Sequence, residues 1–197
     1  MNHIVLAKLI VIAFVILGCN TIVAQTNFEI LDHSENSIEV SGSSTFHDWT
    51  METKTITGNA QFDLKPGNDI IGLTKLEFLL PVLKLKSNLR ALNKNAYKAL
   101  KTKQFKNIVY KLSSAKIIGE KEYTYHIATV GDLTIAGVTK EVYIDIYCFA
   151  NKNGSITTTA KYRIKMTDYG INPPNFMDGL MSTNDMIDID ICIRFER

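Results

Sequence analysis

Strict alternation of apolar and polar residues is the feature that most constrains how this chain can fold. In the segment 187–195 every odd position is apolar and nearly every even position is polar. The segments 142–148 and 156–166 follow the same period of two. Successive side chains on a β-strand point to opposite faces of a sheet, so this alternation predicts strands with one buried and one solvated face.

Other segments rich in β-branched and aromatic residues are also predicted to be strands. These segments are 28–31, 37–46, 56–62, 73–82, 108–118 and 123–135. Residues 119–122 and 151–154 have the composition of hairpin turns. One helix is predicted over 88–102, where apolar residues recur at spacings of three and four. Long strands with one helix indicate an antiparallel barrel or a sandwich, and we favour the barrel because closure removes exposed strand edges.

The first 24 residues have the features of a secretory signal peptide. One lysine precedes the apolar run 9–17, which is shorter than the roughly 20 residues needed to span a bilayer. Cleavage after Ala24 is expected, with lipidation of Cys19 or an uncleaved anchor as alternatives. All three send the protein across a membrane, so a periplasmic or secreted location is expected. A single domain over 26–197 would follow.

The balance of basic and acidic residues argues against one class of function. The chain has 22 basic and 20 acidic residues, a formal net charge of +2. This balance argues against nucleic-acid binding, which usually needs a concentrated basic face. Beyond the leader, Cys148 and Cys192 fall on opposite faces of their strands, so two free thiols are expected rather than a disulfide.

No motif predicts catalysis or a metal site. His33, His47 and His126 are not spaced as metal ligands, and no Gly-x-Ser-x-Gly or phosphate-binding glycine loop occurs. Asp48 cannot easily orient His47, because adjacent residues on a strand point to opposite faces. For His47-Asp48-Trp49 we expect a structural turn at a strand end, with a ligand head-group contact as the alternative.

Four motifs resemble the bacterial YceI-like family. Residues 41–49, Ser-Gly-Ser-Ser-Thr-Phe-His-Asp-Trp, resemble its second-strand signature in a His-Asp-Trp variant. Residues 131–140 resemble its strand pair joined by a Gly-Val-Thr-Lys turn. The stretches 84–87 and 105–108, on either side of the predicted helix, are similar to its strand–helix–strand insertion, and 166–174 is similar to its penultimate loop.

The resemblance implies an all-β, lipocalin-like antiparallel eight-stranded β-barrel with one short α-helix insertion and a long apolar tunnel. It also implies an exported protein that holds a polyisoprenoid, such as an isoprenoid quinone or polyprenyl lipid, and no other cofactor. Gly58, Ala60, Gly131 and Ala160 fall in the inward phase of their strands and are expected to leave room for the chain. Burial of such a tail is favourable by about 25 cal/mol per Å².

Apolar residues in inward phase are expected to form the barrel core. They are Ile56, Phe62, Leu76, Phe78, Leu80, Ile108, Tyr110, Leu133, Ile135, Val142, Ile144, Ile146, Tyr162, Ile164, Ile187, Ile189 and Ile191. Residues near the helix and the barrel mouth are the predicted ligand contacts. These contacts are Trp49, Phe78, Leu80, Leu92, Tyr97, Tyr110 and Tyr162. Residues 168–170 and the pair Pro173-Pro174 are expected to shape a loop at one barrel end, with a gating role as the alternative.

The leading hypothesis is therefore a non-enzymatic, exported carrier or store for an amphiphilic isoprenoid lipid. An envelope stress or interaction protein with a filled barrel is the alternative. An enzyme acting on an amphiphile is less favoured, since only Thr129 and Thr158 place polar groups in inward phase. The lysines around the helix indicate either a solvated face or weak attraction to anionic lipid, which would give transient membrane contact. Homodimerisation stays open.

Overall fold

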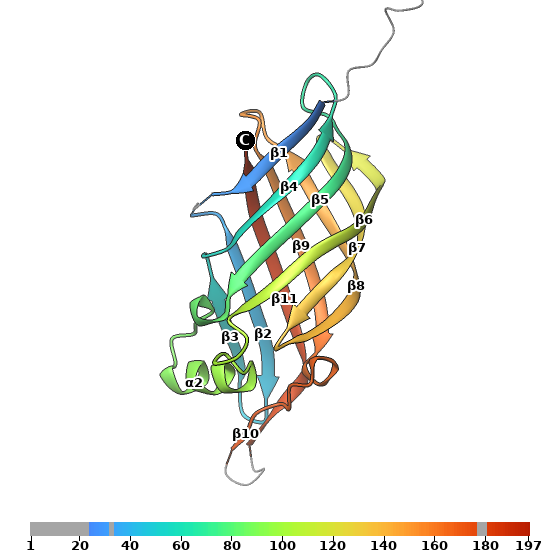
Figure 1. Cartoon of the computed structure of the whole chain (residues 1–197). Helices are drawn as coiled ribbons and strands as arrows, with labels where there is room; N and C mark the ends of the chain where they lie inside the picture. The colour runs from blue at the N-terminus through green and yellow to red at the C-terminus, as the bar shows by residue number, and fades with distance from the viewer. Residues whose placement is uncertain (1–23, 32–33, 177–180) are drawn as a thin grey trace, which may run out of the picture.

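Eight antiparallel strands close into a barrel in the computed structural model, which describes residues 24–31, 34–176 and 181–197 (Figure 1). The ring runs β1, β4, β5, β6, β7, β8, β9, β11 and returns to β1. The strands are β1 (Ala24–Ile30), β4 (Thr57–Leu64), β5 (Ile70–Pro81), β6 (Asn107–Lys121), β7 (Thr124–Ile135), β8 (Val138–Ala150), β9 (Ile156–Lys165) and β11 (Met181–Glu196). The predicted eight-stranded barrel is confirmed. The predicted leader, apart from Ala24, and His33 lie outside the described residues.

Two further strands lengthen one side of the barrel. β11 pairs with β1 near Glu196 and with β2 (Ser37–Ser44) along most of its length, and β2 in turn pairs with β3 (Asp48–Thr53). The outer edge of β3 is met by Lys86, which exchanges two backbone hydrogen bonds with Glu52, of 2.8 and 2.9 Å. The short strand β10 (Asn175–Phe176) pairs with the start of β11.

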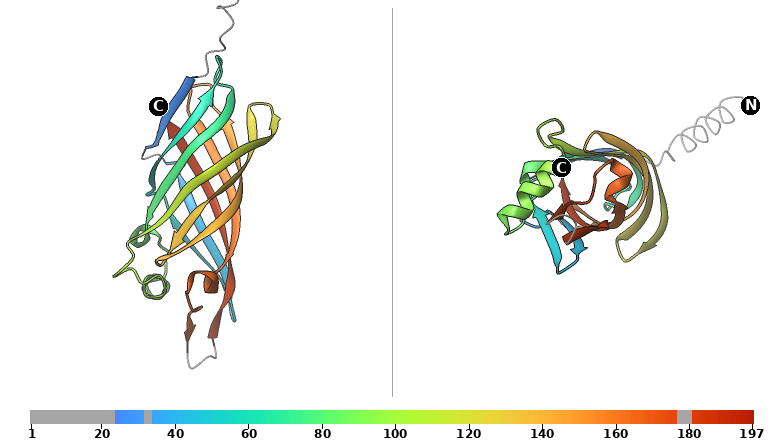
Figure 2. Two further views of the ribbon diagram at one scale, coloured as in Figure 1. Left: turned by 45° about the vertical axis from the view of Figure 1, so that its right-hand side comes forward. Right: turned by 90° about the horizontal axis from the view of Figure 1, so that it is seen from below.

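The helical elements gather at the end of the barrel where β2 and β3 meet (Figure 2). The 3-10 helix η1 (Val82–Lys84) follows β5 and leads to α2 (Arg90–Ala99), which occupies the predicted helix segment. A second 3-10 helix, η2 (Met166–Tyr169), follows β9. Within the described part of the chain, no helix is both long and apolar enough to cross a membrane.

Two hairpins show where turn chemistry decides the strand ends. Between β7 and β8, Ala136 and Gly137 have φ of +49° and +83°, the pair of positive values that a two-residue hairpin turn requires. A Cβ on Gly137 would also lie 2.3 Å from the Phe105 ring. Between β6 and β7 the positive φ values fall on Glu122 and Tyr123. The turn expected at 119–122 is therefore misplaced, because Gly119 is still paired with His126 inside the ladder.

The inward phase predicted from alternation is confirmed throughout. Every residue of the expected core set is buried or packs against the buried cluster. Cys148 is fully buried and Cys192 is half-buried on the other face, and both are free thiols, as expected.

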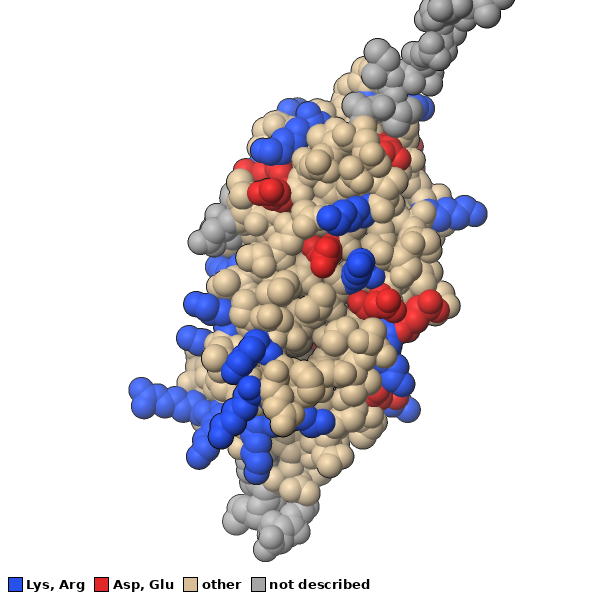
Figure 3. All heavy atoms as spheres, viewed as in Figure 1, with Lys and Arg blue, Asp and Glu red and all other residues tan. Residues whose placement is uncertain are grey.

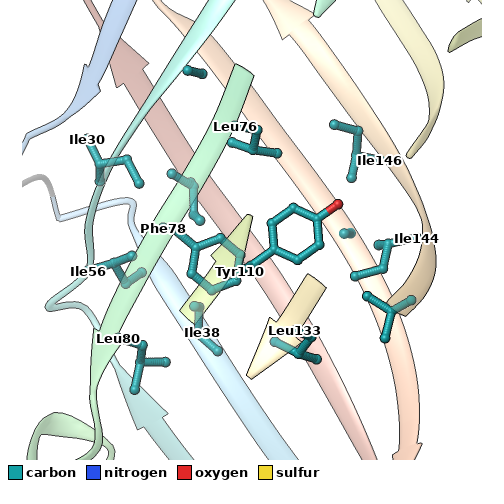
Figure 4. Packing of buried hydrophobic residues seen from close by; sticks show 14 of the residues in the cluster. Ile30, Ile38, Ile56, Leu76, Phe78, Leu80, Tyr110, Leu133, Ile144 and Ile146 are labelled. Carbon is teal, nitrogen blue, oxygen red and sulfur yellow. The ribbon is translucent and has the colours of Figure 1, made fainter. Parts of the chain in front are cut away.

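The barrel interior is filled by aromatic side chains over much of its length. Phe62 makes edge contacts with Phe28 and Phe195, at ring-centroid distances of 5.4 and 6.2 Å. Further along, Phe78 stacks on Tyr110 at 5.5 Å (Figure 4). These rings occupy the space through which a long tunnel was expected to run.

The inward glycines do not leave the expected room. A Cβ on Gly58 would lie 2.1 Å from the Glu77 carbonyl oxygen, so the glycine lets the β5 backbone approach closely. A Cβ on Gly131 would lie 2.7 Å from the Tyr110 hydroxyl, so a ring already takes that space. Ala60 and Ala160 are buried in the same packed core. The expectation of room beside Gly58 and Gly131 is wrong, because neighbouring backbone and an aromatic ring take the space there. At Ala60 and Ala160 it stays a prediction.

Candidate functional site

An apolar cavity of about 110 Å³ lies between α2 and the adjacent end of the barrel. Its walls come from α2, β2, β3, β6, β7, β9, β11 and the segment that follows η2. The apolar lining residues are Val40, Trp49, Met51, Leu85, Leu92, Ala96, Ala99, Leu100, Ile108, Ile135, Ile164, Met166, Ile171, Pro174, Ile187 and Ile189. The volume is below the ~150 Å³ of an apolar protein cavity known to admit benzene. A larger ligand therefore requires part of the cavity wall to move outward.

α2 forms one wall of the cavity and contains no fully buried residue. Leu92, Ala96 and Ala99 lie on one face of the helix and line the cavity. Two polar side chains fix the helix to the preceding segment. Asn93 receives hydrogen bonds from the Ser87 backbone N–H and hydroxyl, at 2.7 and 3.0 Å. The Tyr97 hydroxyl lies within hydrogen-bonding distance of the backbone oxygens of residues 83 and 85.

The segment after β9 closes the cavity from another side. Gly170 ends η2 with φ of +63°, and Met166 and Ile171 on either side of this bend point into the cavity wall. The carboxylate of Asp185 accepts hydrogen bonds from the Thr167 backbone N–H at 2.9 Å and from its hydroxyl at 2.6 Å. These bonds hold the pKa of Asp185 below its ordinary value. The expectation that residues 168–174 shape a loop at one barrel end is confirmed; gating by this loop stays a prediction.

Trp49 supplies the most unusual polar group at the cavity. Its cross-strand partner is Gly42, and its indole occupies the space a side chain there would take. The indole Nε1 is buried and has no hydrogen-bond partner among the described residues. An unpaired buried N–H costs about 1–3 kcal/mol, so a ligand that accepts this hydrogen bond gains affinity.

Two other polar side chains line the cavity, and neither is charged. Asn95 and Thr183 line it, and no side-chain hydrogen bond forms at either within the described residues. With the Trp49 indole, they make up the uncharged polar groups of the lining. An apolar pocket with a few unpaired, uncharged polar groups suits an amphiphile with a neutral head.

The motif His47-Asp48-Trp49 divides between a turn and a strand. The His47 carbonyl accepts hydrogen bonds from the Ser44 backbone N–H and hydroxyl, at 3.0 and 2.7 Å. His47 and Asp48 are exposed, and Asp48 begins β3, which was not predicted. The structural-turn interpretation holds for His47 alone, because Asp48 and Trp49 lie in β3. A head-group contact stays a prediction.

The structure separates the seven predicted ligand contacts into three groups. Trp49 and Leu92 line the cavity. Phe78, Leu80 and Tyr110 belong to the packed core, and Tyr162 is half-buried against it. Tyr97 lies on the other side of α2, along an outer groove. Ligand contact by these seven residues stays a prediction.

Several lining residues were not singled out as ligand contacts. Ala96 and Ala99 share the helical spacing of Leu92, so that periodicity was sufficient to include them. Met166, Ile171 and Pro174 reach the cavity only through the path of the loop after β9, which carries no periodic signal.

The buried polar groups in inward phase are used within the fold. Thr129 accepts a hydrogen bond from the Tyr110 hydroxyl at 3.1 Å and donates one to the Ile144 carbonyl at 2.7 Å. The Thr158 hydroxyl pairs with the Cys148 thiol at 3.3 Å. Burial raises the pKa of Cys148 to about 12, which keeps it protonated at neutral pH. Within the described residues, no three His, Cys, Asp or Glu side chains gather as a metal site.

Comparisons with solved structures agree with this fold. BcnA from Burkholderia cenocepacia superposes with a TM-score of 0.64 at 14% identity, covering 82% of this chain and 96% of BcnA. A polyisoprenoid-binding domain from Saccharophagus degradans, implicated in plant cell wall breakdown, gives 0.62 at 10% identity, covering 88% and 99%. The YceI protein of Campylobacter jejuni gives 0.57 at 19% identity, covering 74% and 83%.

Sequence comparison is decisive for the family. No protein of curated function matches the chain. The model of the YceI-like domain matches residues 30–195, nearly the whole barrel. The motifs at 41–49 and 131–140 lie inside this match, and the chain belongs to the YceI-like domain family.

Proposed function

We propose that this protein is an exported carrier or store for an amphiphilic isoprenoid lipid, whose tail enters the cavity under α2. The observation that supports this most is an apolar cavity with an unpaired indole N–H in its wall. The polyisoprenoid-binding domain of similar fold suggests the ligand class. Export rests on the predicted signal peptide, with a periplasmic or secreted destination and lipidation at Cys19 as the alternative.

The head group follows from the chemistry of the lining. No Lys, Arg, Asp or Glu is among the residues that line the cavity. A charged head inside it would lose its hydration without gaining an opposite charge, which is costly. A quinone carbonyl or an alcohol, by contrast, can accept from the Trp49 N–H. The proposed ligand is therefore an isoprenoid quinone or polyprenol with an uncharged head.

The tail requires movement. The cavity as it stands accepts only a short apolar group, and the stacked pair Phe78 and Tyr110 lies further along the barrel. A long chain must displace α2 outward or displace this pair. Short-chain quinones are therefore the right first ligands, and chain length becomes a measurable property of the site.

Trp49 is the single tryptophan of the chain, so its fluorescence reports on the cavity. Titration with a short-chain isoprenoid quinone should quench it saturably. Ala96→Phe, which fills the cavity from α2, should weaken binding at least about tenfold. Ala91→Phe adds the same ring to an exposed position of the same helix and should leave binding unchanged. No saturable quenching in wild type, or equal loss in both variants, would contradict the proposal.

A filled-barrel envelope protein is the second candidate, because aromatic rings fill much of the interior. Such a protein would bind neither quinones nor polyprenols, and Ala96→Phe would raise its stability by filling an empty space. An enzyme acting on an amphiphile is less favoured, since both buried inward threonines are already hydrogen-bonded. Transient membrane contact is a further prediction of the carrier proposal. Homodimerisation stays open and is testable by light scattering.

A further inference from the structure

A long stretch of the chain around α2 carries no acidic residue. Between Glu77 and Glu120 the sequence contains only basic charges. Eight of them surround α2 and are named here the lysine surface: Lys84, Lys86, Arg90, Lys94, Lys98, Lys101, Lys103 and Lys106. Figure 3 shows basic side chains gathered at the α2 end of the molecule. The net charge of +2 therefore hides a strongly asymmetric distribution.

The charges of the lysine surface are not neutralised by neighbours. Among the described residues, no carboxylate forms an ion pair with any of its eight members, and all eight are exposed. On the barrel wall, by contrast, two basic residues of β9 form ion pairs. Lys161 lies 2.6 Å from Asp190, and Arg163 lies 2.6 Å from Asp188. The positive potential at the α2 end is thus available to an external anion.

Part of the lysine surface lines a groove on the side of α2 that faces away from the cavity. The lining includes Lys94, Lys98, Lys103 and Lys106 together with the apolar Leu83. Tyr97, whose hydroxyl bonds to the η1 segment, supports its floor. The groove combines positive charge with an apolar contact.

Exposed apolar side chains occur at the same end of the barrel. Leu83 in η1 is 53% exposed, and Leu89 at the start of α2 is 59% exposed. Phe46, at the tip of the β2–β3 hairpin, is 69% exposed. Large exposed apolar side chains at the same end as a cluster of lysines are typical of a surface that enters the headgroup region of a membrane.

We infer that the lysine surface, with Phe46, Leu83 and Leu89, docks this protein onto an anionic lipid bilayer. The bases attract the negatively charged headgroups, and the three apolar side chains insert at the interface. This orientation would place α2, the wall of the cavity, against the membrane. The inference rests on the proposed function for its purpose, since docking there would let a lipid pass between bilayer and cavity without crossing water.

The test is sedimentation with vesicles that contain no quinone or polyprenol. Vesicles of 30% phosphatidylglycerol in phosphatidylcholine should bind the protein, and pure phosphatidylcholine vesicles should bind it far less. Each well-placed base contributes about a fivefold change in partitioning, so Lys94→Gln with Lys98→Gln should weaken binding about 25-fold. Lys121→Gln with Lys152→Gln removes the same charge from the opposite end and should change binding by less than about twofold.

Other outcomes overturn the inference. Equal binding to both vesicle types, or equal loss in both double variants, would show that no oriented docking surface exists. Tighter binding to a single-stranded oligonucleotide than to the anionic vesicles would assign the surface to nucleic acid. The triple variant Phe46→Ser, Leu83→Ser and Leu89→Ser should lose the binding that persists in 0.5 M NaCl, and persistence in this variant would exclude insertion.

Failure of docking can be separated from failure of the carrier proposal. Ala96→Phe should lose quinone binding and keep vesicle binding, whereas the Lys94/Lys98 variant should keep short-chain quinone binding and lose vesicle binding. Loss of both activities in either variant would mean that the two surfaces are not separate.

Discussion

The indole of Trp49 occupies the space that a side chain at Gly42 would need. The two residues are cross-strand partners on β2 and β3, and a Cβ at position 42 would lie 2.5 Å from Cζ2 of the indole. Glycine at 42 therefore lets the ring lie against the strand and line the cavity.

Gly42→Val should force the indole away from the β2 backbone. We expect a stability loss of about 1–3 kcal/mol from the overpacked pair, with a change in the tryptophan emission maximum and weaker quinone binding. Thermal unfolding and fluorescence titration measure these effects. Ser41→Val, at the next position and in the opposite strand phase, is the matched control. An unchanged emission spectrum in Gly42→Val would contradict the assigned packing.

Trp49→Phe tests whether the unpaired N–H binds the ligand head. The substitution removes a donor that has no partner in the described protein, so loss of the N–H itself should not lower stability. Affinity for a short-chain quinone should fall about fivefold more than affinity for the matching hydrocarbon without carbonyl groups, corresponding to about 1 kcal/mol. Calorimetric titration of both ligands on both proteins gives this difference. Equal losses for the two ligands would assign only a packing role to Trp49.

Phe78→Ala tests whether the aromatic stack limits chain length. Loss of the ring should cost about 3–5 kcal/mol of stability and join new space to the barrel interior. The variant should bind longer isoprenoid chains relative to short ones than wild type does. Tyr110→Phe keeps the ring and removes only the hydrogen bond to Thr129, so it should cost about 1 kcal/mol and leave the chain-length preference unchanged. The same preference in Phe78→Ala would show that tails enter elsewhere.

Asp185 should make the loop after β9 sensitive to acid. Hydrogen bonds from Thr167 lower its pKa below the ordinary value of 3.8, so its stabilising effect is present above that value and is lost as pH falls through the folded-state pKa. Hydrogen exchange of residues 166–171 should therefore accelerate below about pH 4 relative to the barrel strands. Asp185→Asn should remove this pH dependence while retaining the fold. If the exchange rates of wild type and Asp185→Asn differ by the same factor at pH 5 and at pH 3, this role of Asp185 is contradicted.

The barrel was predictable because alternation is a local signal that burial enforces. Ile187, Ile189 and Ile191 must face inward together, so their spacing alone determines the strand phase. The prediction of free space at Gly58 and Gly131 was wrong because a glycine indicates only that another group approaches the backbone closely. Whether a ligand, a backbone or a ring takes it depends on partners far along the chain.

The site was predictable only in part, because some of its residues are positioned by contacts between segments far apart in the chain. Leu92 and Trp49 lie on elements that the sequence identified, and both line the cavity. Met166 and Pro174 reach it through an irregular loop whose course depends on tertiary contacts such as that between Thr167 and Asp185. The path of this loop cannot be predicted from its residue types alone.

The carrier proposal requires an isoprenoid lipid in the cavity under α2. Native mass spectrometry of protein purified gently from its own cells, followed by solvent extraction, tests it most directly. The predicted result is a bound mass matching an uncharged isoprenoid quinone or polyprenol in wild type and in Ala91→Phe, and its loss in Ala96→Phe. Wild-type protein that carries no lipid and takes up neither quinone nor polyprenol in vitro would contradict the carrier proposal.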